Sequence, residues 1–249
     1  MRSPFLVFLI SFIVLWLSAR VGAEFRKRHL LEDDLRHDLD VVVAAVLTLL
    51  GLITGFSFSM ATSRYDQRKS CEEAEANAIG TEYVRADLLP TADGARVRNL
   101  LSDYLGQRIL FYQTRDEVRL ELINDAAVRL QTDLWSAVQA TGQPPTPLLA
   151  LAVSGMNDVL NSQGYTQAAW SNRIPPAAWV LMLVIAIFAN AMFGYGARRA
   201  KPGVIHLVVL PLVLSIAFLL IADIDSPRSG VIRVAPENLI RLAQSLHPR

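Results

Sequence analysis

The stretch from Val41 to Gly80 constrains the chain most, because it joins an apolar half to a polar half without a proline. Residues 41–63 carry no charged side chain. An α-helix needs about 20 such residues to cross the hydrocarbon core of a bilayer. A segment dense in Arg, Asp and Glu follows from Arg64. The stretch therefore predicts one long helix that crosses a membrane and continues into water.

The apolar half has two unlike faces when its residues are placed at about 100° each around a helix. One face, the small ridge, consists of Gly51, Gly55, Ser59 and Ser63. The opposite side, the bulky face, holds Leu49, Ile53, Phe56 and Met60. Small residues let a second helix backbone approach closely. We therefore expect helix packing on the small ridge, and either lipid or a pore against the bulky face.

The 52% hydrophobic composition is arranged in blocks, which indicates a membrane protein. Four blocks meet the length needed for a span, and they cover residues 4–19, 41–60, 177–196 and 204–224. The fold class that we predict is all-α, a multi-pass membrane protein with four transmembrane helices and a helical extramembrane insert between helices two and three. A net charge of +1 gives no reason to expect a nucleic-acid partner.

The predicted organisation has four parts. They are a first transmembrane hairpin (1–60), a soluble helical insert (61–176), a second transmembrane hairpin (177–225) and a C-terminal tail (226–249). Within the insert, the polar helix from the second span should end near Leu89, and Asp93 should cap a helical hairpin or bent helix that runs to about Ala140. We expect a further helix over 148–160 and a polar loop over 161–176.

Charged residues cluster where spans two and four end, on the same side as the insert. The set is Arg64, Asp66, Glu72, Glu73, Glu75, Asp223, Asp225 and Arg228. A carboxylate at the membrane boundary needs a cation or water. Two interpretations stay open: ion pairs that fasten the two helices together, or a charged ring at the mouth of an oligomeric pore.

Two segments carry a family resemblance: SRYDQRKSCEEAEANAIGTEYVRADLLP from Ser63 and LLIADIDSPRSGVIRVAPENL from Leu219. They resemble the signature regions of the bestrophin-like family of bacterial four-span membrane proteins, which is distantly similar to bestrophin ion channels. That resemblance implies a pentameric ion channel with a cytoplasmic helical body, in which the second span lines a narrow apolar neck at Ile53, Phe56 and Met60. The chain lacks the dense acidic calcium clasp of animal bestrophins, so calcium activation is not expected.

The orientation in the membrane stays open. The basic link at 197–202 predicts a cytoplasmic link and an external insert by the positive-inside rule. The basic residues Arg64, Arg68 and Lys69 after span two indicate the opposite orientation. The cytoplasmic helical body that the resemblance implies agrees with those three residues.

Three function classes remain, in descending order of support. The first is an oligomeric channel or pore. The second is a non-conducting, membrane-anchored scaffold or sensor that recruits a partner through the insert. The third, an enzyme, is not expected, because the chain has no HExxH, no GxSxG and no glycine-rich phosphate loop. With one cysteine, Cys71, no intrachain disulfide or thiolate metal cluster can form, and we expect no cofactor and no metal.

The expected partners follow from the same features. They are the lipid bilayer, ions and further copies of the chain, five in all if it is bestrophin-like. The expected location is a cell membrane, and the inner membrane if the chain is bacterial.

Overall fold

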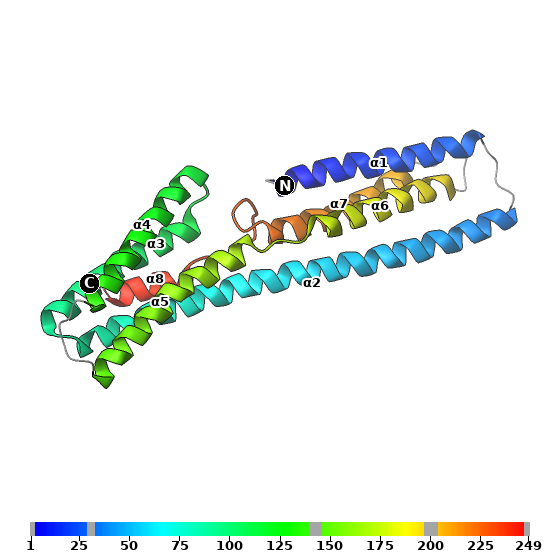
Figure 1. Ribbon diagram of the computed structural model, residues 1–249. Helices are drawn as coiled ribbons and strands as arrows, with labels where there is room; N and C mark the ends of the chain where they lie inside the picture. Colours follow the sequence, from blue (N-terminus) through cyan, green and yellow to red (C-terminus); the bar gives the residue numbers. More distant parts are fainter. Residues whose placement is uncertain (1–2, 29–32, 140–145, 197–203, 247–249) are drawn as a thin grey trace. The chain divides into compact units, whose positions relative to one another are not determined.

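The computed structural model describes residues 3–28, 33–139, 146–196 and 204–246 (Figure 1). The chain divides into two compact units, each with its own core. Unit 1 consists of residues 1–64 and 173–232, and unit 2 of residues 65–172 and 233–249. The helix α2 (Asp33–Arg85) contributes to both, as the sequence predicted for one uninterrupted helix.

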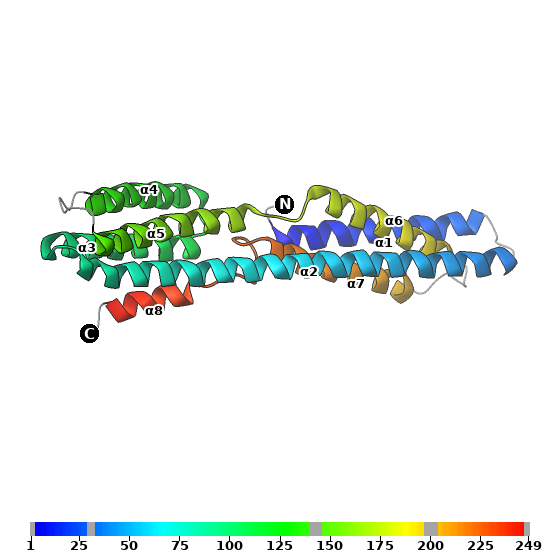
Figure 2. The same cartoon turned by 60° about the horizontal axis from the view of Figure 1, so that its bottom comes forward.

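Among the described residues, four helical segments are long and apolar enough to cross a membrane, and their apolar parts lie in unit 1. Besides the first part of α2, they are α1 (Pro4–Arg28), α6 (Pro176–Gly196) and α7 (Val204–Asp225). Helix α1 packs side by side with α6 and α7 in both views (Figures 1 and 2). The core of the unit includes Leu15, Leu50, Met182 and Phe218. The predicted four-span helical architecture is confirmed, although α1 continues nine residues past the predicted end at Ala19.

Helices α1 and α6 approach each other closely enough that two glycines cannot be replaced freely. A Cβ atom added at Gly22 would overlap the backbone carbonyl oxygen of Ala191. A Cβ atom added at Gly194 would overlap the carbonyl oxygen of Ala19. Small residues at a membrane helix crossing permit this backbone contact. The small-residue packing of unit 1 therefore lies between α1 and α6.

We expect Gly194→Ala to destabilise unit 1, because the added methyl group would meet backbone rather than a movable side chain. Forced overpacking costs about 1–3 kcal/mol. Gly106→Ala is the matched control, since an added Cβ there meets nothing within 4 Å. The control should be neutral or stabilising, because alanine has the higher helix propensity. Thermal unfolding of both variants in detergent tests this, and equal melting temperatures would contradict it.

Unit 2 is a helical body with its own apolar core. Besides the polar part of α2, its elements are the short 3₁₀ helix η1 (Ala86–Leu88), α3 (Thr91–Gln113), α4 (Glu117–Gln139), α5 (Pro147–Ser171) and α8 (Glu237–Leu246). Figure 2 shows α8 lying along the polar part of α2. The core side chains that are fully buried include Ile79, Leu101, Leu134, Met156 and Leu239.

The predicted helix start at Asp93 is wrong. Pro90 occupies the N-cap position of α3 with φ −52° and ψ 144°, and Asp93 lies within the first turn. A proline lacks the N–H that a helix start leaves unpaired, and its fixed φ suits this place. Of the two predicted forms, the hairpin is found, because Thr114 adopts an extended backbone and separates α3 from α4.

The predicted polar loop over 161–176 is also wrong for its first eleven residues. Helix α5 continues to Ser171. Its polar side chains Gln163 and Thr166 are buried and form hydrogen bonds inside unit 2. Their polarity therefore reflects internal partners and not exposure to water.

Two other predictions concern the basic link and the C-terminal tail. The basic link at 197–202 lies outside the described residues. The tail expected from residue 226 is divided between the units, with residues 226–232 in unit 1 and the remainder in unit 2.

Candidate functional site

The apolar half of α2 is the least covered of the four spans. Only 17% of its most apolar window is buried, against 44% for α7. One stripe of the helix faces unit 1, and it consists of Val43, Leu50, Ser57 and Ala61. Two of the four small-ridge residues are glycines, and an added Cβ at Gly51 or Gly55 meets nothing within 4 Å. Ser59 and Ser63 are exposed as well.

The bulky face is mostly exposed too. Leu49, Phe56 and Met60 are exposed, and Phe56 has 62% of its surface accessible. Ile53 differs, because it is partly buried against the core of unit 1. The described residues of a single chain therefore cover neither the small ridge nor most of the bulky face.

An ion pair within unit 1 joins the end of the apolar half of α2 to the end of α7. Arg64 Nη1 lies 3.6 Å from Asp225 Oδ1, and both side chains are largely buried. The backbone N–H of Ile174 donates to both carboxylate oxygens of Asp225, at 3.1 and 3.2 Å. Asp225 thus holds together three segments: α2 at Arg64, the end of α7 and the residues before α6.

Asp223 organises the turn after α7. Its carboxylate accepts hydrogen bonds from the backbone N–H groups of Val231 and Ile232, at 2.7 and 2.8 Å. Gly230 lies inside this turn, where an added Cβ would overlap the carbonyl oxygen of Asp223. Arg228 is half-buried in the same turn. The sequence predicted a cation or water for Asp223, but did not predict that backbone amides would bind it.

The remaining acidic candidates lie in unit 2 and differ in exposure. Asp66 and Glu73 are exposed, whereas Glu72 and Glu75 are buried. Glu72 Oε1 accepts from the backbone N–H groups of Asn238 and Leu239, at 2.9 and 3.0 Å. These amides belong to the first turn of α8, where the helix dipole favours a negative charge. Glu72 therefore fixes the start of α8 on α2.

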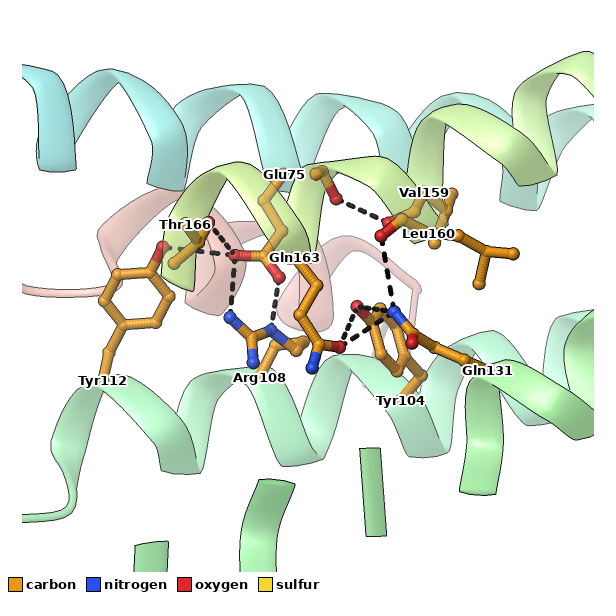
Figure 3. Close-up of polar contacts among 10 residues, drawn as sticks. Glu75, Tyr104, Arg108, Tyr112, Gln131, Val159, Leu160, Gln163 and Thr166 are labelled. Atoms are coloured by element: carbon orange, nitrogen blue, oxygen red, sulfur yellow. Dashed lines mark hydrogen bonds and ion pairs between the residues drawn. The ribbon is translucent and has the colours of Figure 1, made fainter. Parts of the chain in front are cut away.

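Glu75 is the centre of a buried polar network between α2, α3 and α5 (Figure 3). It forms a fully buried ion pair with Arg108 through Nε. The hydroxyl groups of Tyr112 and Thr166 each donate to Glu75 Oε2 at 3.2 Å. The side chain of Arg108 also lies over the ring of Phe111, 4.4 Å from its centroid.

A second group of hydrogen bonds lies beside the first (Figure 3). The Tyr104 hydroxyl donates to Gln163 Oε1 at 3.0 Å, and Gln131 Nε2 donates to the same oxygen at 2.9 Å. Burial and the nearby Glu75 raise the pKa of Tyr104 and of Tyr112. Both hydroxyls therefore stay neutral and act as donors.

The sequence did not reveal this network, although Arg108 gave a signal. Arg108 continues the three-and-four spacing of Leu101, Tyr104 and Leu105 on the buried face of α3. A charge at such a position requires a buried partner. The network offers no activated nucleophile, and one of its buried donors, Arg108 Nη1, has no hydrogen-bond partner in the described part of the chain. Within the described residues no three His, Cys, Asp or Glu side chains are placed to hold a metal ion.

Comparison with known proteins gives a consistent result. The family model for the bestrophin-like domain matches residues 5–239. Curated protein sequences yield no match. Solved structures with a similar fold include a bacterial bestrophin homologue from Klebsiella pneumoniae with a tryptophan-to-alanine mutation. It has a TM-score of 0.68 and 11% identity, and the match covers 99% of this chain and 98% of that chain.

Two further structures of the Klebsiella pneumoniae homologue agree with it. The form with a leucine-to-threonine mutation has a TM-score of 0.64 and 12% identity, with 99% of both chains covered. The form solved by zinc phasing has a TM-score of 0.63 and 12% identity, with 97% of this chain and 96% of that chain covered. At this identity the likeness concerns the fold.

We expect Glu75→Gln to destabilise the helical body strongly, because it leaves the buried guanidinium of Arg108 without its charge partner. Breaking a buried pair costs about 3–5 kcal/mol. Asp87→Asn is the control, since it removes one partner of the more exposed pair with Arg98 and should cost about 0–1 kcal/mol. Chemical unfolding in detergent measures both. Similar losses of unfolding free energy in the two variants would show that the buried pair contributes no more to stability than the exposed one.

Proposed function

This chain belongs to the bestrophin-like family, and on that premise we propose that it is one subunit of an oligomeric ion channel whose neck is lined by the apolar half of α2. The observation that carries the proposal is the exposed surface of α2, because the described part of the chain leaves the small ridge and most of the bulky face uncovered. Lipid alone would not require a ridge of small residues beside a bulky face. Neighbouring copies of α2 would use both.

The proposed division of the two faces follows from their shapes. The small ridge packs between subunits, because Gly51 and Gly55 leave room for another backbone. The bulky face then points at the ions, and Phe56 forms the tightest part because it is the most exposed side chain of that face. Ile53 lies at the edge of the neck, since it is partly buried against its own unit. Apolar constrictions of this kind gate by excluding water.

The charged residues divide into a buried, paired group and an exposed group. Arg64 and Asp225 are largely buried in an ion pair, so we assign them to fastening α2 onto α7. Asp66 and Glu73 are exposed on α2. They are the candidates for a charged ring at the pore mouth, because only an exposed carboxylate can meet a hydrated ion.

The number of subunits and the location belong to the same proposal. A ring of five copies is proposed from the family resemblance, with the α2 helices around the axis. The chain is a membrane protein by its four apolar helices. We place it in the inner membrane of a bacterium, since the similar solved structures are of a bacterial homologue.

The test is single-channel current through purified protein in planar bilayers. Phe56→Ala should raise the conductance, because a smaller side chain widens an apolar constriction and lets water enter. Phe188→Ala is the matched control: it lies on α6 with 63% of its surface exposed, against 62% for Phe56. The control should conduct like the wild type.

The oligomeric state is measured first, by native mass spectrometry of the same preparation in detergent. A monomer would overturn the pore, because the proposed neck is formed by α2 helices from several copies of the chain. An oligomer that carries no current at either polarity would favour the alternative, a non-conducting scaffold or sensor. Equal currents from wild type and Phe56→Ala would remove Phe56 from the neck.

A further inference from the structure

Glu82 is a buried carboxyl group that the proposed channel does not use. It lies on the polar part of α2, and none of its surface is exposed within the chain. Both of its carboxylate oxygens are buried without a hydrogen-bond partner. In this it differs from Glu72, which binds amides of α8, and from Glu75, which binds Arg108.

The recess that holds Glu82 is formed by a glycine on α5. A Cβ atom added at Gly155 would overlap Glu82 Oε2 and crowd Arg85 Nη1. The carboxyl group therefore fills the space that a side chain at position 155 would need. Arg85 directs a hydrogen bond of 3.5 Å to the carbonyl oxygen of Leu151. Within the described residues, no cation forms an ion pair with Glu82.

An ionised carboxylate in such a place is unfavourable. Removal from water without a compensating partner penalises the charged form, and the group binds a proton instead. Burial raises the pKa of Glu82 to about 8; Arg85 on the same helix opposes the rise, and Asp158 on α5 adds to it. The next acidic residue along the chain, Asp87 in η1, is exposed and pairs with Arg98.

We infer that Glu82 is a proton-binding site of the helical body, protonated while α2 packs against α5 and ionised when the two helices separate. The ligand is a proton, and the recess at Gly155 defines the site. The inference does not rest on the channel proposal, because it concerns the packing of two helices within unit 2.

The direction of the pH dependence follows from which state holds the proton. Well below the ordinary glutamate pKa, the packed and separated states are both protonated, and packing is at its full strength. Between that value and about 8, only the packed state keeps the proton. Its advantage therefore falls as the pH rises, and the loss is complete once the pH passes the pKa of the packed state.

The only cysteine of the chain provides a reporter of this packing. Cys71 lines a groove of about 640 Å³ between α2 and α5, together with Asp158 and Tyr165. Separation of the two helices widens this groove and increases the rate at which iodoacetamide alkylates the thiol. The thiolate fraction also depends on pH, so the rate is read as a ratio of the wild type to a variant at each pH.

The first test detects the proton directly. Infrared spectra of the full chain in detergent at pH 6 should contain a protonated carboxyl band that disappears in Glu82→Gln. Glu73→Gln is the control, because Glu73 is an exposed glutamate on the same helix, and its band should match the wild type. Absence of any such band in the wild type would overturn the inference and indicate an ionised Glu82 paired with Arg85.

The second test measures the consequence. The ratio of Cys71 alkylation rates, wild type to Glu82→Gln, should rise steadily from pH 6 to pH 9, because the packed state continues to lose its advantage until the pH passes its pKa. At that pH, one unit above the pKa, about nine-tenths of the molecules carry an ionised Glu82. A ratio that stays constant from pH 6 to pH 9 would overturn the inference.

A third variant guards against a general loss of structure in Glu82→Gln. Gly155→Ala keeps the carboxyl group but displaces it from the recess, because only the flexible ends of Glu82 and Arg85 stand in the way. Its alkylation should lose the pH response of the wild type, while its infrared band at pH 6 weakens. An unchanged band and an unchanged pH response in this variant would overturn the assignment of the recess. None of these measurements depends on conduction.

Discussion

The backbone of the apolar half of α2 must satisfy its own hydrogen bonds, because hydrocarbon offers no partner for an exposed N–H or C=O group. That constraint keeps the segment helical, and the absence of proline lets the helix continue into the polar half, so that α2 is 53 residues long in all. Each half of α2 buries one stripe of side chains in the core of its own unit. Leu50 and Ser57 are buried in unit 1, and Glu75 and Ile79 in unit 2. What remains uncovered on the apolar half is the surface from which the channel proposal is built.

Membrane spans are predictable from sequence because length and hydropathy are properties of a continuous segment. The position of a polar residue in a helical body is not, because it depends on partners that are distant along the chain. Gln163 bonds to Tyr104 across 59 residues, and Thr166 to Glu75 across 91. Read alone, residues 161–171 therefore resemble a loop. The partners of Asp223 were equally unpredictable, because every residue except proline has a backbone N–H group and the sequence does not show which of them will bind a carboxylate.

The polar half of α2 contains three buried carboxylates, and each is neutralised in a different way. Glu72 binds the first amides of α8, where a helix dipole supports a negative charge. Glu75 binds a guanidinium and two hydroxyl groups. Glu82 has no such partner among the described residues and binds a proton instead. Buried ion pairs add little net stability but penalise wrong arrangements. The first two carboxylates therefore fix which helices pack where.

Arg108 and Glu82 differ in how they respond to pH. The guanidinium of Arg108 would lose its proton more easily when buried, but Glu75 holds the pKa of Arg108 above its ordinary value, so Arg108 keeps its charge. Glu75 secures α3, and through the Thr166 hydroxyl it also secures the later part of α5. Gly155 lies eleven residues earlier on α5, about 16 Å along the helix at 1.5 Å per residue. Ionisation of Glu82 therefore acts on α5 about three turns from its anchor at Thr166, at the Asp158 end of the groove that Cys71 lines.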